Sequence, residues 1–265
     1  MPTATVNGSR MGYTDTGGSG SAVLLLHAFP LDARMWEAQI ASLRENFRVI
    51  APDLKGFGGS DAPDDPGAYS MEGYANDVKS LLDELGVDKA SVVGLSMGGY
   101  VALALSRLHS DLISALVLAD SRAEADPPEG KEKRTAQQQQ VREQGTAGLI
   151  EGLSGALLGT TTKEQKPDVV ERTKTLMDAG PEGFIGALEA MKNRSDSTGY
   201  LAKIGVPTLV IVGEEDGVTP PEASRKMHEH IGGSRLVVLP GVGHLSNLEA
   251  PEAFNRALEE FLRGL

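Results

Sequence analysis

The stretch 90-ASVVGLSMGGYVALALSRLHS-110 sets a serine between glycines, where a strand pattern is followed by a helix pattern. Its small and β-branched residues Ala90–Val93 predict a buried strand, and Met97–Leu108 predict a helix. A serine hydroxyl is a poor nucleophile at neutral pH unless a base removes its proton and amide donors stabilise the oxyanion that forms. Gly-x-Ser-x-Gly between a strand and a helix is the pattern that presents such a serine on a sharp turn. We therefore predict that Ser96 is a catalytic nucleophile.

Composition restricts the classes of partner that we expect. Of the 265 residues, 40% are hydrophobic and 23% are charged, as in globular proteins with a sizeable core. The formal net charge of −12 repels phosphate backbones and anionic membrane surfaces, so we expect neither a nucleic acid nor a membrane as partner. The chain has no cysteine, which excludes thiol catalysis, disulfides and cysteine-based zinc sites. No signal-peptide or membrane-span pattern is evident, and we expect a cytoplasmic protein.

Short apolar runs alternate with longer helical patterns, which predicts an α/β protein with a mostly parallel eight-stranded sheet flanked by helices. The first two strands meet near Asn7-Gly8, which favours an antiparallel hairpin at the start of the sheet. The expected strands are Thr3–Val6, Arg10–Asp15, Ala22–Leu26, Arg48–Ala51, Ala90–Val93, Ala115–Ala119, Thr208–Val212 and Arg235–Leu239. The expected helices are Met35–Glu45, Met71–Leu85, Met97–Leu108, Pro221–Ile231 and Pro251–Leu262.

The pattern changes between Ser121 and Tyr200. Strand-like runs disappear, and a charged, glutamine-rich stretch is followed by three segments typical of short amphipathic helices. We predict a core formed by residues 1–120 and 200–265, with a helical cap at residues 121–199 inserted after the sixth strand. The alternative, a few more layers of an ordinary domain, stays open.

Two further strands end in loops that carry an acid and a base. Asp216 follows the apolar run Thr208–Val212, and His244 follows Arg235–Leu239. Because parallel strands release their loops at the same sheet edge, Ser96, Asp216 and His244 can converge there. In that case Asp216 would fix the tautomer of the imidazole, and His244 would act first as base and then as acid.

Each of these assignments has an alternative. Asp120 ends another strand at the same edge and is the rival of Asp216. Asp216 also fits a simple turn, since Asp-Gly favours turns, and His244 also fits a loop histidine bonded to a carbonyl.

An early strand-to-helix loop, 22-AVLLLHAFPLDARMW-36, is the expected source of an oxyanion hole. The amides of Phe29 and Met97 are the predicted donors, and His27 is expected to brace this loop. His228 and His230 stand two apart on a helix and face different ways, so we predict no metal site. We expect a modest apolar substrate pocket lined by His27, Trp36, Leu149, Leu153, Phe184 and Leu188.

Together these residues resemble the α/β-hydrolase superfamily over nearly the whole chain outside the cap. The stretches APDLKGFGGSD (51–61) and GEEDGVTPP (213–221) are similar to loops of that family. GVGHLSNLEAPEAFNRALEEFL (241–262) is similar to the subgroup of 3-oxoadipate enol-lactonases, small carboxyl- and arylesterases and cofactor-free haloperoxidases. The resemblance implies the α/β-hydrolase fold and serine acylation without metal or coenzyme. The family usually has His-Gly where this chain has His27-Ala28, so the position of the Phe29 amide depends on whether Ala28 needs a positive φ.

The resulting hypothesis is a serine hydrolase that cleaves small carboxylic esters through an acyl-enzyme on Ser96, without a cofactor. A lactonase of the enol-lactonase type is one alternative, weakened because no arginine cluster beyond Arg122 is evident for a dicarboxylate. Pro30 leaves a perhydrolase or haloperoxidase-like activity open, and a non-catalytic ligand receptor on the same fold is the alternative from another class. The expected partner is a small-molecule ester or lactone. The oligomeric state, a homo-oligomer included, is left open.

Overall fold

Eight strands form one sheet in the computed structural model, which describes residues 2–265. The strand order is β1-β2-β4-β3-β5-β6-β7-β8; β2 runs antiparallel to both of its neighbours, and the other pairs are parallel. This confirms the predicted mostly parallel eight-stranded sheet. The strands are β1 (Thr3–Val6), β2 (Ser9–Asp15), β3 (Ala22–Leu26), β4 (Arg48–Pro52), β5 (Ala90–Leu95), β6 (Ile113–Ala119), β7 (Thr208–Gly213) and β8 (Arg235–Leu239).

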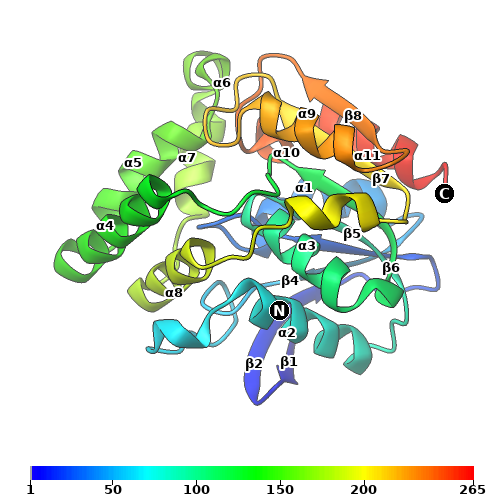
Figure 1. Ribbon diagram of the computed structural model, residues 1–265, viewed down its shortest axis with the longest axis horizontal. Helices are drawn as coiled ribbons and strands as arrows, with labels where there is room; N and C mark the ends of the chain where they lie inside the picture. Colours follow the sequence, from blue (N-terminus) through cyan, green and yellow to red (C-terminus); the bar gives the residue numbers. More distant parts are fainter. Residues whose placement is uncertain (1) are drawn as a thin grey trace.

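Helices cover both faces of the sheet (Figure 1). Alternate residues of the central strands supply the two cores: Leu24 and Leu26 face one core, and Val23 and Leu25 face the other. No helix formed by residues 2–265 is both long enough and apolar enough to cross a membrane. The helices are α1 (Glu37–Leu43), α2 (Met71–Glu84), α3 (Met97–Leu108), α9 (Pro221–His230), α10 (Ser246–Glu249) and α11 (Pro251–Leu262), with 3-10 turns η1 (Ala33–Trp36), η2 (Pro66–Ala68), η3 (Ser110–Leu112) and η4 (Thr198–Lys203).

The first predicted helix, Met35–Glu45, differs most from the structure. The chain turns earlier, at η1, because the Asp32 side chain accepts a hydrogen bond from Arg34 N at 2.9 Å and starts a 3-10 turn at Ala33. The α-helix proper then runs over Glu37–Leu43.

Helices also fill the chain between β6 and β7, in the region that we call the cap segment (residues 121–199). Figure 1 shows these helices gathered at one side of the sheet. The short helix α6 was not expected, because TTTKEQ carries no apolar periodicity. The helices of the cap segment are α4 (Pro128–Gln144), α5 (Ala147–Leu157), α6 (Thr160–Gln165), α7 (Pro167–Thr175) and α8 (Pro181–Lys192).

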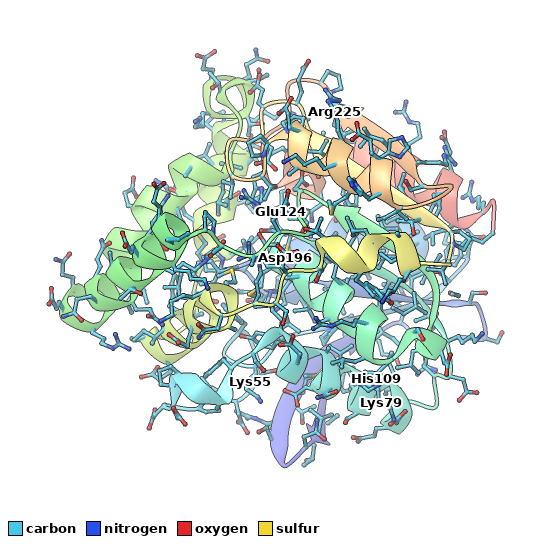
Figure 2. The ribbon with its side chains drawn as sticks, in the orientation of Figure 1. Lys55, Lys79, His109, Glu124, Asp196 and Arg225 are labelled. Atoms are coloured by element: carbon cyan, nitrogen blue, oxygen red, sulfur yellow. The ribbon has the colours of Figure 1, made fainter. Side chains whose placement is uncertain are left out.

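The cap segment leaves and rejoins the sheet at neighbouring points. Figure 2 shows Glu124 and Asp196 close together there. Asp196 Oδ2 accepts a hydrogen bond from Ala125 N at 3.1 Å, and Ser197 N donates to Ala123 O at 2.8 Å. The segment is therefore closed at its base by its own backbone.

Candidate active site

Ser96 lies on the turn between β5 and α3, at the carboxyl end of a strand that pairs with β3 and β6. Its backbone, at φ 55° and ψ −113°, is unusual for a residue other than glycine. A Cβ at Gly98 would lie 2.0 Å from Leu26 O, so only glycine allows α3 to begin this close to the end of β3. The turn holds the Ser96 hydroxyl at the sheet edge where the other parallel strands end.

His244 lies between Ser96 and Asp216. His244 Nε2 is 2.8 Å from Ser96 Oγ, and His244 Nδ1 is 2.8 Å from Asp216 Oδ2. Because Nδ1 faces a carboxylate, it carries the ring proton, and Nε2 is left to accept the proton of Ser96. All three residues are buried. The arrangement has the geometry of a nucleophile, its base and an acid that orients the base.

Local hydrogen bonds orient the Asp216 carboxylate. Its Oδ1 accepts from Val218 N and Thr219 N, at 2.8 and 2.9 Å, and its Oδ2 accepts from Thr219 Oγ1 at 2.6 Å. Thr219 is fully buried, and its hydroxyl also lies 3.2 Å from His244 Nδ1. Sequence reasoning missed Thr219. The available signal was a threonine three residues after the acid, a spacing at which short polar side chains bond locally.

Asp120, the rival acid, is occupied elsewhere. Its Oδ1 accepts a hydrogen bond from Gly213 N at 2.9 Å, and its Oδ2 accepts from the hydroxyl of Ser246. No hydrogen bond joins Asp120 to the His244 ring in the described part of the chain, residues 2–265. Asp120 thus links the end of β7 to the loop that carries His244, and the geometry favours Asp216 as the partner of the imidazole.

The pKa values of these two buried carboxyl groups shift in opposite directions. Burial alone would raise the pKa of Asp216, but the charge of His244 and the hydrogen bonds from His244 and Thr219 hold that pKa below its usual range. Burial, and then the neighbouring charge of Asp216, raise the pKa of Asp120 well above its usual range. The two shifts favour Asp216 as the charged group beside His244.

Two free amides lie where an oxyanion hole is predicted. Neither Phe29 N nor Met97 N donates a hydrogen bond to any of residues 2–265. Met97 is the first residue of α3, where the amide has no intrahelical acceptor and the positive end of the helix dipole adds to its attraction for an anion. Phe29 lines the same cavity as Ser96. Both donors thus stay available for a developing negative charge.

His27 fixes the orientation of the Phe29 amide. Its Nε2 accepts from Leu54 N at 2.9 Å, so the proton is on Nδ1, which donates to Ala28 O at 3.0 Å. Ala28 O and Phe29 N–H lie on opposite edges of one planar peptide, so holding the carbonyl also directs the N–H. Burial lowers the pKa of His27 and keeps the ring neutral. Ala28 has no positive φ, so the alanine in place of the usual glycine causes no strain.

A cavity of about 280 Å³ opens beside Ser96 and His244. Leu153 lines it, and Phe184 lies behind it, with its ring packed edge-on against Phe29 at a centroid distance of 5.3 Å. The other apolar side chains at the cavity come from α3, from the cap segment and from the loop after β7: they are Tyr100, Ala156, Leu157, Met191 and Val218.

The remaining residues predicted for the pocket lie elsewhere. Trp36 is buried against Phe254 of α11, at a centroid distance of 6.0 Å. His27 lies behind the Phe29 loop, where it braces Ala28. Leu149 and Leu188 pack into the core that α2, α3 and the cap segment share, because the apolar face of a helix is buried mainly against other helices. None of these four lines the cavity beside Ser96 in the described chain.

Three cations line this cavity: Arg122, Lys133 and Arg134. Sequence reasoning named Arg122 but missed Lys133 and Arg134. Arg134 pairs with Asp126, whereas no carboxylate among residues 2–265 pairs with Arg122 or Lys133. Arg122 donates to the backbone oxygen of Val218 instead. Lys133 and Arg134 lie on α4 and Arg122 follows β6, so the sequence pattern did not indicate that the three line one cavity.

The histidines outside this site are bonded to side-chain or backbone oxygens. The His228 ring bonds Ser234 Oγ and the His230 ring bonds Lys226 O, each at 2.8 Å. His109, far from the cap segment in Figure 2, bonds Asn76 Oδ1 at 2.8 Å. No group of three potential metal ligands occurs in the part of the chain that the structure describes.

The fold and the geometry around Ser96 define the class of this protein. The chain belongs to the alpha/beta hydrolase fold family, whose model matches residues 21–251. This range contains Ser96, Asp216 and His244, and it confirms the resemblance found in the sequence.

The similar proteins include esterases and lactonases. The structure is similar to that of a thermophilic esterase from Thermogutta terrifontis, solved with malate bound, with a TM-score of 0.94 and 40% identity over 99% of this chain and 98% of the other. It is also similar to an enol-lactonase from Burkholderia xenovorans, with a TM-score of 0.92 and 31% identity over 99% of this chain and all of the other. A 3-oxoadipate enol-lactonase of Acinetobacter baylyi is 30% identical over 243 residues, covering 91% of this chain and 88% of that protein.

Proposed function

We propose that the protein is a serine hydrolase that cleaves small carboxylic esters through an acyl-enzyme on Ser96. The observation that carries this proposal is the continuous chain from Ser96 Oγ through both ring nitrogens of His244 to Asp216, with two contacts of 2.8 Å. Such a chain lets a neutral serine lose its proton as it attacks. The similarity of the whole protein to an esterase and to an enol-lactonase supports the proposal independently.

The proposed reaction has two halves. Ser96 Oγ attacks the ester carbonyl while His244 Nε2 takes the hydroxyl proton, and the amides of Phe29 and Met97 bind the oxyanion. The intermediate collapses, and the alcohol leaves with the proton from His244. Water then attacks the acyl group, with His244 again as base, which releases the carboxylic acid and restores the Ser96 hydroxyl. Asp216 stays ionised throughout and holds the imidazolium that forms in each half.

Cavity size sets the expected substrate preference. At about 280 Å³ the cavity lies at the small end of the roughly 300–1,000 Å³ usual for ligand pockets. In a series of p-nitrophenyl esters we expect the highest kcat/KM between acetate and butyrate and a loss of at least about 10-fold for decanoate, whose chain the cavity cannot enclose. Simple lactones, and acetate with hydrogen peroxide, belong in the same series to detect lactonase or perhydrolase activity.

The same series can contradict the proposal. Absence of turnover for every ester and lactone, combined with a ligand that raises the Tm, would support the non-catalytic receptor instead. A kcat/KM that keeps rising up to decanoate would retain the hydrolase but remove the preference for small acyl groups.

A lactonase or esterase for substrates that carry a carboxylate is a second candidate, favoured by Arg122 and Lys133. These two cations face the cavity without an internal carboxylate partner, in a chain whose net charge is −12. The names of relatives such as the 3-oxoadipate enol-lactonase fit this observation. An anionic group on the acyl chain would complete an ion pair with Arg122, which is half-buried, so that the pair is screened less than at the surface.

Exchanging Arg122 for methionine tests this candidate. We compare monomethyl glutarate with methyl valerate, its neutral counterpart, and follow acid release at constant pH. The wild type is expected to prefer the glutarate ester, and Arg122→Met is expected to reduce that preference by about 10-fold, since hydrogen bonds to charged groups contribute about 1.5–3 kcal/mol. Lys131→Met is the control, because Lys131 is exposed on α4 and does not line the cavity. An equal preference in wild type and Arg122→Met would remove this candidate.

A further inference from the structure

The loop that carries His244 lies backbone to backbone against the cap segment. A Cβ at Gly243 would lie 2.1 Å from Gly159 N, at the junction between α5 and α6. Real Cβ atoms do not approach a backbone nitrogen this closely, so glycine is required at position 243. The residue before His244 therefore contacts the cap directly, with no side chain between them.

One buried carboxylate joins the two sides of this contact. Glu249 Oε2 accepts hydrogen bonds from Gly243 N at 3.0 Å and from Gly159 N at 2.9 Å, and Oε1 accepts from Leu245 N at 3.1 Å. The side chain of Glu249 is 1% exposed. Glu249 thus accepts hydrogen bonds from the amides on both sides of His244. The oxygen that binds Gly243 N also binds Gly159 N of the cap segment.

Further bonds tie the cap segment to the loops around the site. Leu157 O accepts from His244 N at 3.1 Å, and Lys166 Nζ donates to the backbone oxygen of Glu249 at 2.6 Å. Thr161 donates through its amide and its hydroxyl to the carboxylate of Glu215, at 2.9 and 2.6 Å. Glu215 immediately precedes Asp216. The cap segment is therefore bonded both to the histidine loop and to the acid loop.

We infer that Glu249 is a positioning residue that keeps the His244 ring oriented toward Ser96. Through its bond to Gly159, Glu249 also makes the position of His244 depend on the cap segment. This inference rests on the proposed function, in which His244 moves the proton. Three amides converge on the carboxylate, and a carboxylate has acceptor sites for all of them. Glutamine keeps the shape but places an amide donor against at least one amide donor, which forces the loop or the side chain to move.

Glu249→Gln in the full chain tests the inference. Because a displacement of about 1 Å at a catalytic group can cost about 100-fold in rate, we expect kcat for p-nitrophenyl acetate to fall by about 10- to 100-fold while KM changes by less than about two-fold. Proton NMR supplies a readout that does not depend on turnover. The resonance of the His244 Nδ1 proton, which is strongly deshielded by its bond to Asp216, is expected to shift or disappear.

Two further variants complete the design. Glu252→Gln is the matched control. The side chain of Glu252 is exposed on α11 and makes no hydrogen bond with any of residues 2–265. Lys166→Met removes a contact from the cap side only. It is expected to lower kcat by about three-fold or more and to shift the same resonance. Should Glu249→Gln fail to fold, Glu249→Asp takes its place in both measurements, because the shorter side chain withdraws the carboxylate from the three amides.

Each outcome decides a different claim: the role of Glu249, the role of the cap segment or the proposed function. If Glu249→Gln keeps its kcat and its His244 resonance, whether or not the Tm falls, Glu249 is only structural and the inference is overturned. If Glu249→Gln behaves as expected but Lys166→Met leaves the resonance unchanged, the part assigned to the cap segment is overturned. If the wild type turns over no ester, the proposed function fails instead, and the His244 resonance compared between the wild type and Glu249→Gln still reports whether Glu249 holds the ring against Asp216.

Discussion

Ser96→Ala is expected to lower kcat for p-nitrophenyl acetate by at least about 10⁴-fold. The alanine removes the atom that attacks the ester, whereas His244, Asp216 and the two free amides remain. Water can then only attack the ester directly, and oxyanion binding and substrate positioning accelerate that reaction weakly. Initial rates at saturating ester, corrected for spontaneous hydrolysis, measure the loss. Circular dichroism melting checks that the variant is folded.

A serine on the same strand provides the matched control. Ser91 is buried on β5 like its neighbours, but it lies near the amino end of the strand and bonds Ser114 Oγ at 3.2 Å. Ser91→Ala is therefore expected to cost about 1 kcal/mol of stability through the loss of a partly buried hydrogen bond, and to leave kcat within about two-fold. Retention of more than about a hundredth of the wild-type kcat in pure Ser96→Ala would contradict an acyl-enzyme on Ser96.

The fold could be predicted because most strands from β3 onward are short, buried apolar runs that alternate with helical patterns. β3 and β8 begin and end where the sequence places them. β5 runs on to Leu95, past the predicted end at Val93, because Gly94 and Leu95 continue the pairing with β6 up to the turn that carries Ser96. Apolar periodicity shows where a strand forms, but the partner strand decides where it ends.

The residues that line the cavity could not be predicted as well as the strands, because they depend on how each cap helix is oriented about its own axis when it packs over the sheet. Leu149 and Leu153 are four residues apart on α5 and share one helix face, yet Leu149 enters the core and Leu153 lines the cavity. The cations Arg122 and Lys133 belong to different elements and meet only through packing. Helical periodicity identifies a buried face, but it does not say which neighbour covers each residue on that face.

The choice of acid depended on interatomic contacts for a similar reason. Asp120 and Asp216 both follow strands that end at the same sheet edge, and no rule of spacing separates them. In the structure Asp216 lies 2.8 Å from the His244 ring, and Asp120 bonds Gly213 and Ser246. The difference between the two acids can be tested by the same conservative substitution at both positions.

Asp216→Asn is expected to lower kcat by about 10⁴-fold. Asp216 Oδ1 accepts from two backbone amides, Val218 N and Thr219 N, so the asparagine must keep its oxygen there. Its NH₂ group then faces His244 Nδ1 and donates to it. The ring proton moves to Nε2, which can no longer accept the proton of Ser96. The substitution thus preserves the shape of the site and reverses the tautomer of the base.

Asp120→Asn is the matched control, and its expected effect on kcat is at most about three-fold. Asp120 does not bond the His244 ring, and an asparagine amide can accept from Gly213 N through its oxygen and donate to Ser246 Oγ through its nitrogen. Rates for both variants at pH 7 with p-nitrophenyl acetate, together with their Tm values, make the comparison. If Asp120→Asn showed the larger loss, the roles of the two acids would have to be exchanged. If both variants kept near wild-type rates, the imidazole would need no acid partner, and the proton path through His244 would be refuted.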